Sequence, residues 1–164
     1  MTGWIQRTFW EISDDCCAAI AERLRPGMRT LETGSGRSTE LFERMGCQHV
    51  ALEHDPRRGA RSRSVVMAPL TGDPPWYDWV PPHACDLILI DGPAWWIGRG
   101  GVMRVLPYLL HDHTVVVIDD THRAAERRLA ERIAADYGMR AEYHARRALG
   151  VKRGFGVLTP TQGC

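Results

Sequence analysis

The stretch LETGSGRS, residues 31–38, carries two glycines in a G-x-G pattern directly after a short strand-like segment. Gly34 and Gly36 permit a tight bend and let a ligand approach the backbone closely. A helix that starts after such a turn favours a carboxylate or a phosphate, because its first backbone N–H groups are unpaired. A dinucleotide fingerprint needs a third glycine where Thr39 stands, and no Walker lysine follows. The turn alone is weak evidence, so the rest of the chain must identify its ligand.

The segments around this turn alternate between strand and helix patterns. Apolar runs predict strands over residues 29–33, 49–55, 64–68, 85–91 and 114–120. Amphipathic or capped segments predict helices over residues 14–24, 38–45, 101–111 and 124–138, whereas the proline-rich residues 69–85 read as a loop. Two last strands, over residues 140–145 and 154–159, have no helix between them and should pair as an antiparallel hairpin at the sheet edge. The chain is therefore predicted to be an α/β protein, a Rossmann-like doubly wound and mostly parallel sheet of about seven strands.

Composition narrows the classes of function. The 164 residues, 44% hydrophobic and 25% charged, predict a single globular domain over residues 1–164. A formal net charge of +1 gives no overall field that favours nucleic acid or an anionic membrane. No apolar run approaches the roughly 20 residues that span a bilayer, and MTGWIQRTFWEISDD lacks the apolar core of a signal peptide. Five cysteines without a C-x-x-C pair fit a reducing compartment, so we expect a cytoplasmic protein.

Acidic residues follow the predicted parallel strands at the edge where such sheets bind ligands. They are Glu32 and Glu53 at the first two strands, Asp73 after the third, Asp91 after the fourth, and Asp119 with Asp120 after the fifth. A single acid at a strand end is often only a helix cap, but a whole rim of acids is harder to explain in that way. A carboxylate near the glycine turn suits ribose, whose two hydroxyl groups can both donate to one acid.

With these residues in place, the chain resembles the class I methyltransferases that use S-adenosylmethionine. The likeness spans nearly the whole chain and rests on ETGSGRS at residues 32–38, ALEHD at 51–55, DLILIDGP at 86–93 and VVVIDD at 115–120. The resemblance implies that Glu32 and the glycine turn hold the methionine moiety, Glu53 the ribose, and the region around Asp73 the adenine, with Trp76 as a stacking partner. Asp91 would face the reacting centre. The implied cofactor-binding set is Glu32, Thr33, Gly34, Ser35, Gly36, Ser38, Glu53, His54, Asp73, Asp91 and Gly92.

Methyl transfer to a hydroxyl group needs alignment with the methyl donor and loss of a proton. The candidate catalytic residues are Asp91, Asp119 and His122. Asp91, Asp119 and Asp120 could also hold a hard divalent ion such as Mg²⁺, a site similar to that of catechol-type O-methyltransferases. In the alternative interpretation, one of the two adjacent aspartates caps the following helix and the other pairs with Arg123.

Several features leave two interpretations open. Trp95 and Trp96 either line an acceptor pocket or cover a neighbouring surface, such as a homodimer contact. Arg99 either meets an acidic acceptor or pairs with a strand-end aspartate. Four arginines between residues 57 and 63, at Arg57, Arg58, Arg61 and Arg63, favour a solvated face over an RNA patch, because no aromatic residues interleave them.

We expect a methyltransferase acting on a small-molecule acceptor, with oxygen favoured as the acceptor atom. The alternatives are a non-catalytic nucleoside-binding protein of the same fold and, less favoured by Thr39 and the terminal hairpin, a nicotinamide-dependent Rossmann enzyme.

Overall fold

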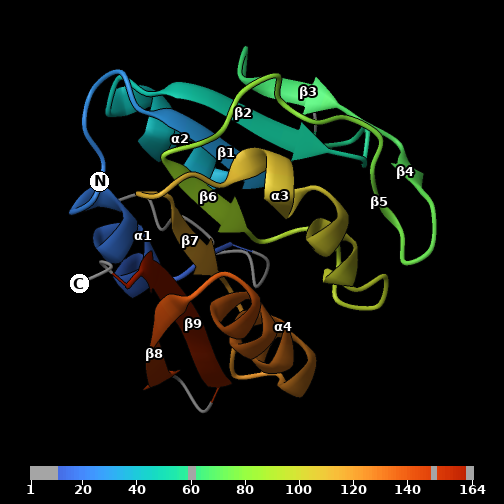
Figure 1. Cartoon of the computed structure of the whole chain (residues 1–164). Helices are drawn as coiled ribbons and strands as arrows, with labels where there is room; N and C mark the ends of the chain where they lie inside the picture. The colour runs from blue at the N-terminus through green and yellow to red at the C-terminus, as the bar shows by residue number, and fades with distance from the viewer. Residues whose placement is uncertain (1–10, 59–61, 149–150, 162–164) are drawn as a thin grey trace, which may run out of the picture.

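A computed structural model describes residues 11–58, 62–148 and 151–161 of the chain (Figure 1). Its main sheet has seven strands in the order β3-β2-β1-β6-β7-β9-β8, and the first five of these pair in parallel. The strands are β1 (Arg29–Thr33), β2 (Gln48–Glu53), β3 (Val65–Met67), β6 (Leu87–Ile90), β7 (Val115–Ile118), β8 (Met139–Ala148) and β9 (Val151–Pro160). The predicted α/β class and strand number are therefore confirmed.

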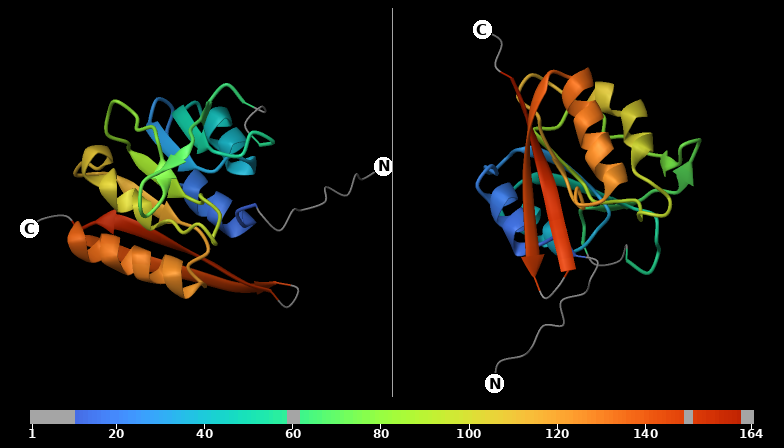
Figure 2. Two further views of the ribbon diagram at one scale, coloured as in Figure 1. Left: turned by 90° about the vertical axis from the view of Figure 1, so that its right-hand side faces the viewer. Right: turned by 90° about the horizontal axis from the view of Figure 1, so that it is seen from below.

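Helices cover both faces of the sheet, as the view from below shows (Figure 2). On one face lie α1 (Asp14–Ala21) and α2 (Arg37–Arg44), and on the other lie α3 (Leu106–Leu109) and α4 (Ala124–Asp136). Side chains alternate along each central strand, so that Leu87 and Leu89 pack with the first pair of helices while Ile88 and Ile90 pack with the second. This alternation explains why the central strands read as unbroken apolar runs.

The C-terminal hairpin completes the sheet. Strand β9 pairs antiparallel with β7 and with β8, and places β8 at the edge. The hairpin is longer than the sequence predicted, because its pairing continues to Ala148 and Val151. The predicted antiparallel end of the sheet is thus confirmed.

Two segments differ from the prediction. The proline-rich segment contains a small two-stranded sheet, β4 (Leu70–Thr71) with β5 (Trp76–Tyr77), where only a loop was expected. The helix expected over residues 101–111 is instead a 3₁₀ helix (Gly100–Arg104) followed by the short α3. Pro107 supplies the physical reason, since it has no N–H to donate and is tolerated only in the first turn of a helix.

The expectations about membrane helices and cysteines can be compared with the structure only over the described residues. In the ranges that the structure describes, no helix is long and apolar enough to cross a membrane. The four cysteines within these ranges, Cys16, Cys17, Cys47 and Cys85, are free. The first ten residues, Arg61 and Cys164 lie outside the described residues.

Candidate functional site

The predicted site lies at the carboxyl ends of β1, β2, β6 and β7. The glycine turn begins with Gly34, whose φ of 88° is in the left-handed region that favours glycine. Its N–H donates to the carbonyl of Leu52 at 2.8 Å, so the turn is fastened to the end of β2. The hydroxyl group of Thr33 accepts from the N–H groups of Asp91 and Gly92 at 3.2 and 3.1 Å. Thr33 is fully buried, and its hydrogen bonds connect the turn to the end of β6.

Glu32 supports the turn from beneath. Its carboxylate accepts hydrogen bonds from the hydroxyl groups of Ser38 and of Thr39, the latter at 2.7 Å, and lies 3.3 Å from His49 Nε2. His49 in turn contacts Thr30 through Nδ1 at 2.9 Å. Only 1% of Glu32 is exposed. In this arrangement the residue positions the first turn of α2, and its contact with a methionine moiety stays a prediction.

Glu53 ends β2 beside the glycine turn, and both its oxygens have protein donors. One oxygen accepts from the N–H groups of His54 and Asp55 at 2.8 and 2.9 Å, and the other from the N–H and hydroxyl groups of Ser35 at 3.2 and 3.1 Å. A ribose that binds here must therefore compete with these protein donors for the carboxylate oxygens. The predicted partners Glu53, Ser35 and His54 do lie together.

Tyr77 fills the space between these strand ends, although the sequence did not single it out. A Cβ atom added to Gly92 would collide with the Tyr77 hydroxyl oxygen and lie 2.8 Å from Gly34 N. Tyr77 is only 3% exposed, and its hydroxyl group has no hydrogen-bond partner within the described part of the chain. Burial, followed by the charges of Glu53 and Asp91, raises its pKa. The side chain thus lies close enough to Glu53, predicted to hold the ribose, and to Asp91, predicted to face the reaction, for both charges to act on it.

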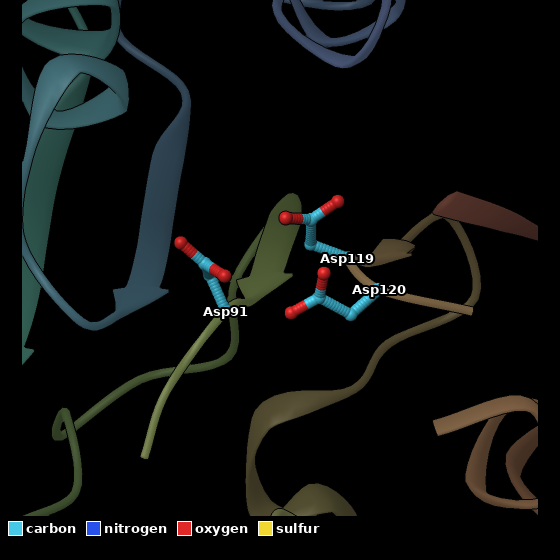
Figure 3. A group of neighbouring side chains, drawn as sticks. All are labelled: Asp91, Asp119 and Asp120. Atoms are coloured by element: carbon cyan, nitrogen blue, oxygen red, sulfur yellow. The ribbon is translucent and has the colours of Figure 1, made fainter. Parts of the chain in front are cut away.

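The three aspartates of the predicted metal site come together at the ends of β6 and β7 (Figure 3). One carboxylate oxygen from each lies within 4.8 Å of the others. Asp120 is the single non-glycine residue of the described chain with a positive φ, 63°, and this backbone conformation follows directly on Asp119 at the end of β7. We call these residues, Asp91, Asp119 and Asp120, the acid cluster.

Arg99 is buried in the acid cluster, with 4% of its side chain exposed. Its Nη2 lies 3.3 Å from Asp91 Oδ1 and 3.1 Å from Asp120 Oδ2, and its Nη1 donates to the carbonyl of Asp119 at 2.9 Å. The second of the two predicted roles, an ion pair with a strand-end aspartate, is the one observed. The predicted pair between an aspartate and Arg123 is also present, with Asp120 at 3.0 Å, whereas the predicted helix cap by the other aspartate is not, because α4 begins with no side-chain hydrogen bond at its N-cap, Arg123.

The electrostatics of the cluster favour protonated carboxyl groups. Burial, reinforced by the charge of Asp119, raises the pKa of Asp91 well above its usual value, against the opposing effect of Arg99. Burial and the neighbouring Asp120 raise the pKa of Asp119 to about 6. A carboxylate with a pKa near neutrality is suited to accept a proton from a substrate.

Two predicted residues, Asp73 and Trp76, lie apart from this centre, and a third, His122, lies at its edge. Asp73 is exposed in the turn between β4 and β5, at the periphery of the structure (Figure 1). Trp76 is 2% exposed and packs in the core, where Gly101 leaves room for it. His122 lines a separate cavity, and its Nδ1 is 3.9 Å from Asp120 Oδ1. Burial lowers the pKa of His122.

Solved structures with this fold cover nearly the whole chain. The O-methyltransferase from Bacillus cereus, solved in complex with S-adenosylhomocysteine, matches 94% of this chain and 84% of its own at 16% identity, with a TM-score of 0.67. The O-methyltransferase TomG from Streptomyces achromogenes, involved in tomaymycin synthesis and solved with S-adenosylmethionine, matches 93% and 82% at 15% identity, with a TM-score of 0.64. A TehB-like methyltransferase from Corynebacterium glutamicum matches 89% and 87% at 17% identity, with a TM-score of 0.60.

These likenesses define the fold. No protein-family model matches the sequence, and no curated protein matches it. The chain has the fold of the class I S-adenosylmethionine-dependent methyltransferases, as its motifs predicted.

Proposed function

We propose that the protein is a methyltransferase that uses S-adenosylmethionine and methylates an oxygen atom of a small molecule. The observation that carries the proposal is the meeting of Gly34, Glu53 and Asp91 at the strand ends, in a fold shared with methyltransferases solved with S-adenosylmethionine or its product. S-adenosylmethionine would supply an activated methyl group, which leaves alignment and proton removal to the protein.

The residues at the site match the donor in chemical kind. Glu53 offers a carboxylate for two ribose hydroxyl groups, and the glycine pair Gly34 and Gly92 permits close approach to the backbone. The hydroxyl group of Tyr77 has no partner within the described part of the chain and lies against Gly92, in the space that the donor would need. It could therefore bond the donor as a further polar contact, or it could obstruct donor binding. We propose that the donor displaces this ring when it binds.

Asp119 is the base that we propose for the acceptor hydroxyl group. Its raised pKa places it close to the range in which a carboxylate accepts a proton effectively near neutral pH. Asp91 shares the cluster and would lie nearer the donor. His122 is a weaker candidate, since its ring belongs to the adjoining cavity.

The predicted Mg²⁺ would have to compete with Arg99. The three carboxylates are the ligand type that Mg²⁺ prefers, but the guanidinium group already bonds Asp91 and Asp120. We therefore expect calorimetry with Mg²⁺ or Mn²⁺ to give no heat of binding in the wild-type protein. Binding at millimolar metal would show that the metal displaces the guanidinium group and would restore the metal-dependent mechanism.

The function is tested first by donor binding. Thermal shift with S-adenosylmethionine, S-adenosylhomocysteine and NAD should give stabilisation by the first two only, about 2.7 kcal/mol at a hundredfold excess over Kd. Glu53→Gln should abolish this shift, whereas Asp91→Asn should spare binding more than turnover of labelled donor with a panel of hydroxylated acceptors. A shift with NAD alone would contradict the proposal.

A second candidate is a non-catalytic protein of the same fold. The burial of Tyr77 at the donor position and the four protein donors to Glu53 favour it specifically. No shift with any of the three ligands would support this candidate. Trp95 and Trp96 lie in the loop after β6, are exposed and pack edge to face with ring centroids 5.8 Å apart. In a non-catalytic protein we would assign them to a partner or homodimer contact rather than to an acceptor. The cytoplasmic location remains a prediction in either case.

A further inference from the structure

A cavity of about 290 Å³ lies beside the acid cluster, between the start of α4 and the terminal hairpin. Its walls include His122, Arg123 and Arg127 from the β7–α4 connection and α4, and Tyr143 and His144 from β8. The cavity is large enough for a small organic group. It is separate from the space at the glycine turn that we assign to the methyl donor.

The side chains that can bring charge to this cavity are basic ones, apart from a tyrosine. Its ionisable lining residues are two arginines, two histidines and a tyrosine, and no acidic residue lines the cavity within the described part of the chain. Asp120 and Glu131 each bond one guanidinium group, at 3.0 and 2.8 Å. Each of these contacts uses part of a group with five N–H donors, so Arg123 and Arg127 retain donors for a ligand.

Two further polar atoms in the wall make no hydrogen bond to the described residues, although one of them, His122 Nδ1, lies 3.9 Å from Asp120 Oδ1. Nδ1 of His122 and the hydroxyl oxygen of Tyr143 are buried, and neither has a hydrogen-bond partner among the residues that the structure describes. Buried polar atoms are normally paired, and both of these can donate to a negatively charged oxygen.

The wall is held in place by packing. The guanidinium group of Arg127 lies 3.3 Å above the ring centroid of Tyr143. A Cβ atom at Gly156 would be 3.2 Å from that ring, and one at Gly154 would be 2.9 Å from the carbonyl oxygen of His144. Gly156 thus leaves the space that the Tyr143 ring occupies, and Gly154 lets the backbones of β9 and β8 approach closely at the cavity.

We propose that this cavity binds the anionic group, a carboxylate or a phosphate, of a small molecule. Asp120 joins the cavity to the reaction centre, because one of its oxygens contacts both Arg99 and Arg123. The molecule is then the methyl acceptor, anchored by its anion beside the acid cluster. That second step rests on the proposed function, whereas the anion site itself does not.

The site is tested with inorganic phosphate and with acetate, titrated by calorimetry into the full chain without methyl donor at constant ionic strength. The variants are Tyr143→Phe, which keeps the ring, and Arg127→Gln, with Arg128→Gln as the control for an equal loss of charge on the same helix. We expect binding in the wild type, a loss of about tenfold or more in affinity in the first two variants, and no change in the control. The tighter of the two anions identifies the ligand class.

Absence of binding by both anions, or an equal loss in Arg127→Gln and Arg128→Gln, would overturn the site. Tyr143→Phe with unchanged affinity would do the same. These results leave donor binding untouched, so the failure of the anion site and of the proposed function are distinguishable. If the anion belongs to the acceptor, the anion that binds should also inhibit methyl transfer competitively with the acceptor and leave the affinity for S-adenosylhomocysteine unchanged. Inhibition through the donor would contradict the assignment.

Discussion

Replacement of Tyr77 tests whether its side chain blocks the donor site or lines it. If the donor displaces the ring, the wild-type protein loses the burial of an aromatic side chain when it binds. Burial of such a side chain is worth about 2 kcal/mol. Tyr77 is 3% exposed, so nearly all of this term applies. Displacement also rehydrates a buried hydroxyl group without a partner, which returns about 1 kcal/mol or more.

These two free-energy contributions predict an order of donor affinity for the wild type and two variants. Tyr77→Ala has no ring to displace and should bind most tightly. Tyr77→Phe has the ring without the offsetting hydroxyl group and should bind most weakly, by about 2 kcal/mol or roughly thirtyfold relative to the alanine variant. The wild type should lie between them. Stability should run in the opposite order, with the phenylalanine variant about 1 kcal/mol above the wild type and the alanine variant about 3 kcal/mol below it.

The affinities are measured by calorimetry with S-adenosylhomocysteine, well below the unfolding temperature of the alanine variant, and the stabilities by urea denaturation. Tyr108→Ala removes a tyrosine that is 73% exposed and is the control, which should change neither quantity appreciably. If Tyr77→Ala binds more weakly than the wild type, the ring is a contact of the bound donor, and displacement is refuted.

Three other substitutions test the support of the site. Asp119→Asn should remove a dependence of the free energy of unfolding on pH. Because the pKa of Asp119 is raised in the folded state, its protonation stabilises the fold below about pH 4, and this stabilisation is lost as the pH rises through about 6. The difference in stability between wild type and variant should therefore change by at most about 3 kcal/mol over that window, and a constant difference would contradict it. Glu32→Ala should lose about 3 kcal/mol in urea denaturation, since three buried partners lose their acceptor, whereas the exposed Glu131→Ala should lose about 0.5 kcal/mol. Arg99→Lys should lose about 3 kcal/mol, because one ammonium group cannot bond both strand ends, and full stability of this variant would show that charge alone suffices.

The fold was predictable because its signals are local. Central strands buried on both faces give apolar runs, and helices give their own period and caps, as when Ser13 accepts the N–H of Cys16 at the start of α1. The β4–β5 sheet was missed because its strands have two residues each and lie in a proline-rich segment. No periodicity exists over so short a distance, and only the adjacent aromatic residues Trp76 and Tyr77 signalled a buried strand.

The site was predictable to the extent that topology decides it. Parallel strands bring Glu32, Glu53, Asp91 and Asp119 to one edge whatever their side chains do. Which way each carboxylate faces depends on partners distant in sequence. Glu32 turns to α2 because Ser38 and Thr39 offer hydroxyl groups there, a pairing that no strand pattern reveals.

The charges around the acid cluster indicate which carboxyl group holds a proton. Asp91, Asp119 and Asp120 carry three negative charges when ionised, while Arg99 and Arg123 supply two positive charges in contact with them. Asp120 bonds both guanidinium groups and is the best compensated, so the excess charge falls on the other two. One proton shared between Asp91 and Asp119 balances the cluster, in agreement with the raised pKa of both. The pKa of Asp119, raised to about 6, leaves this group ionised near neutral pH, which is the state that the base proposed for the acceptor hydroxyl group requires.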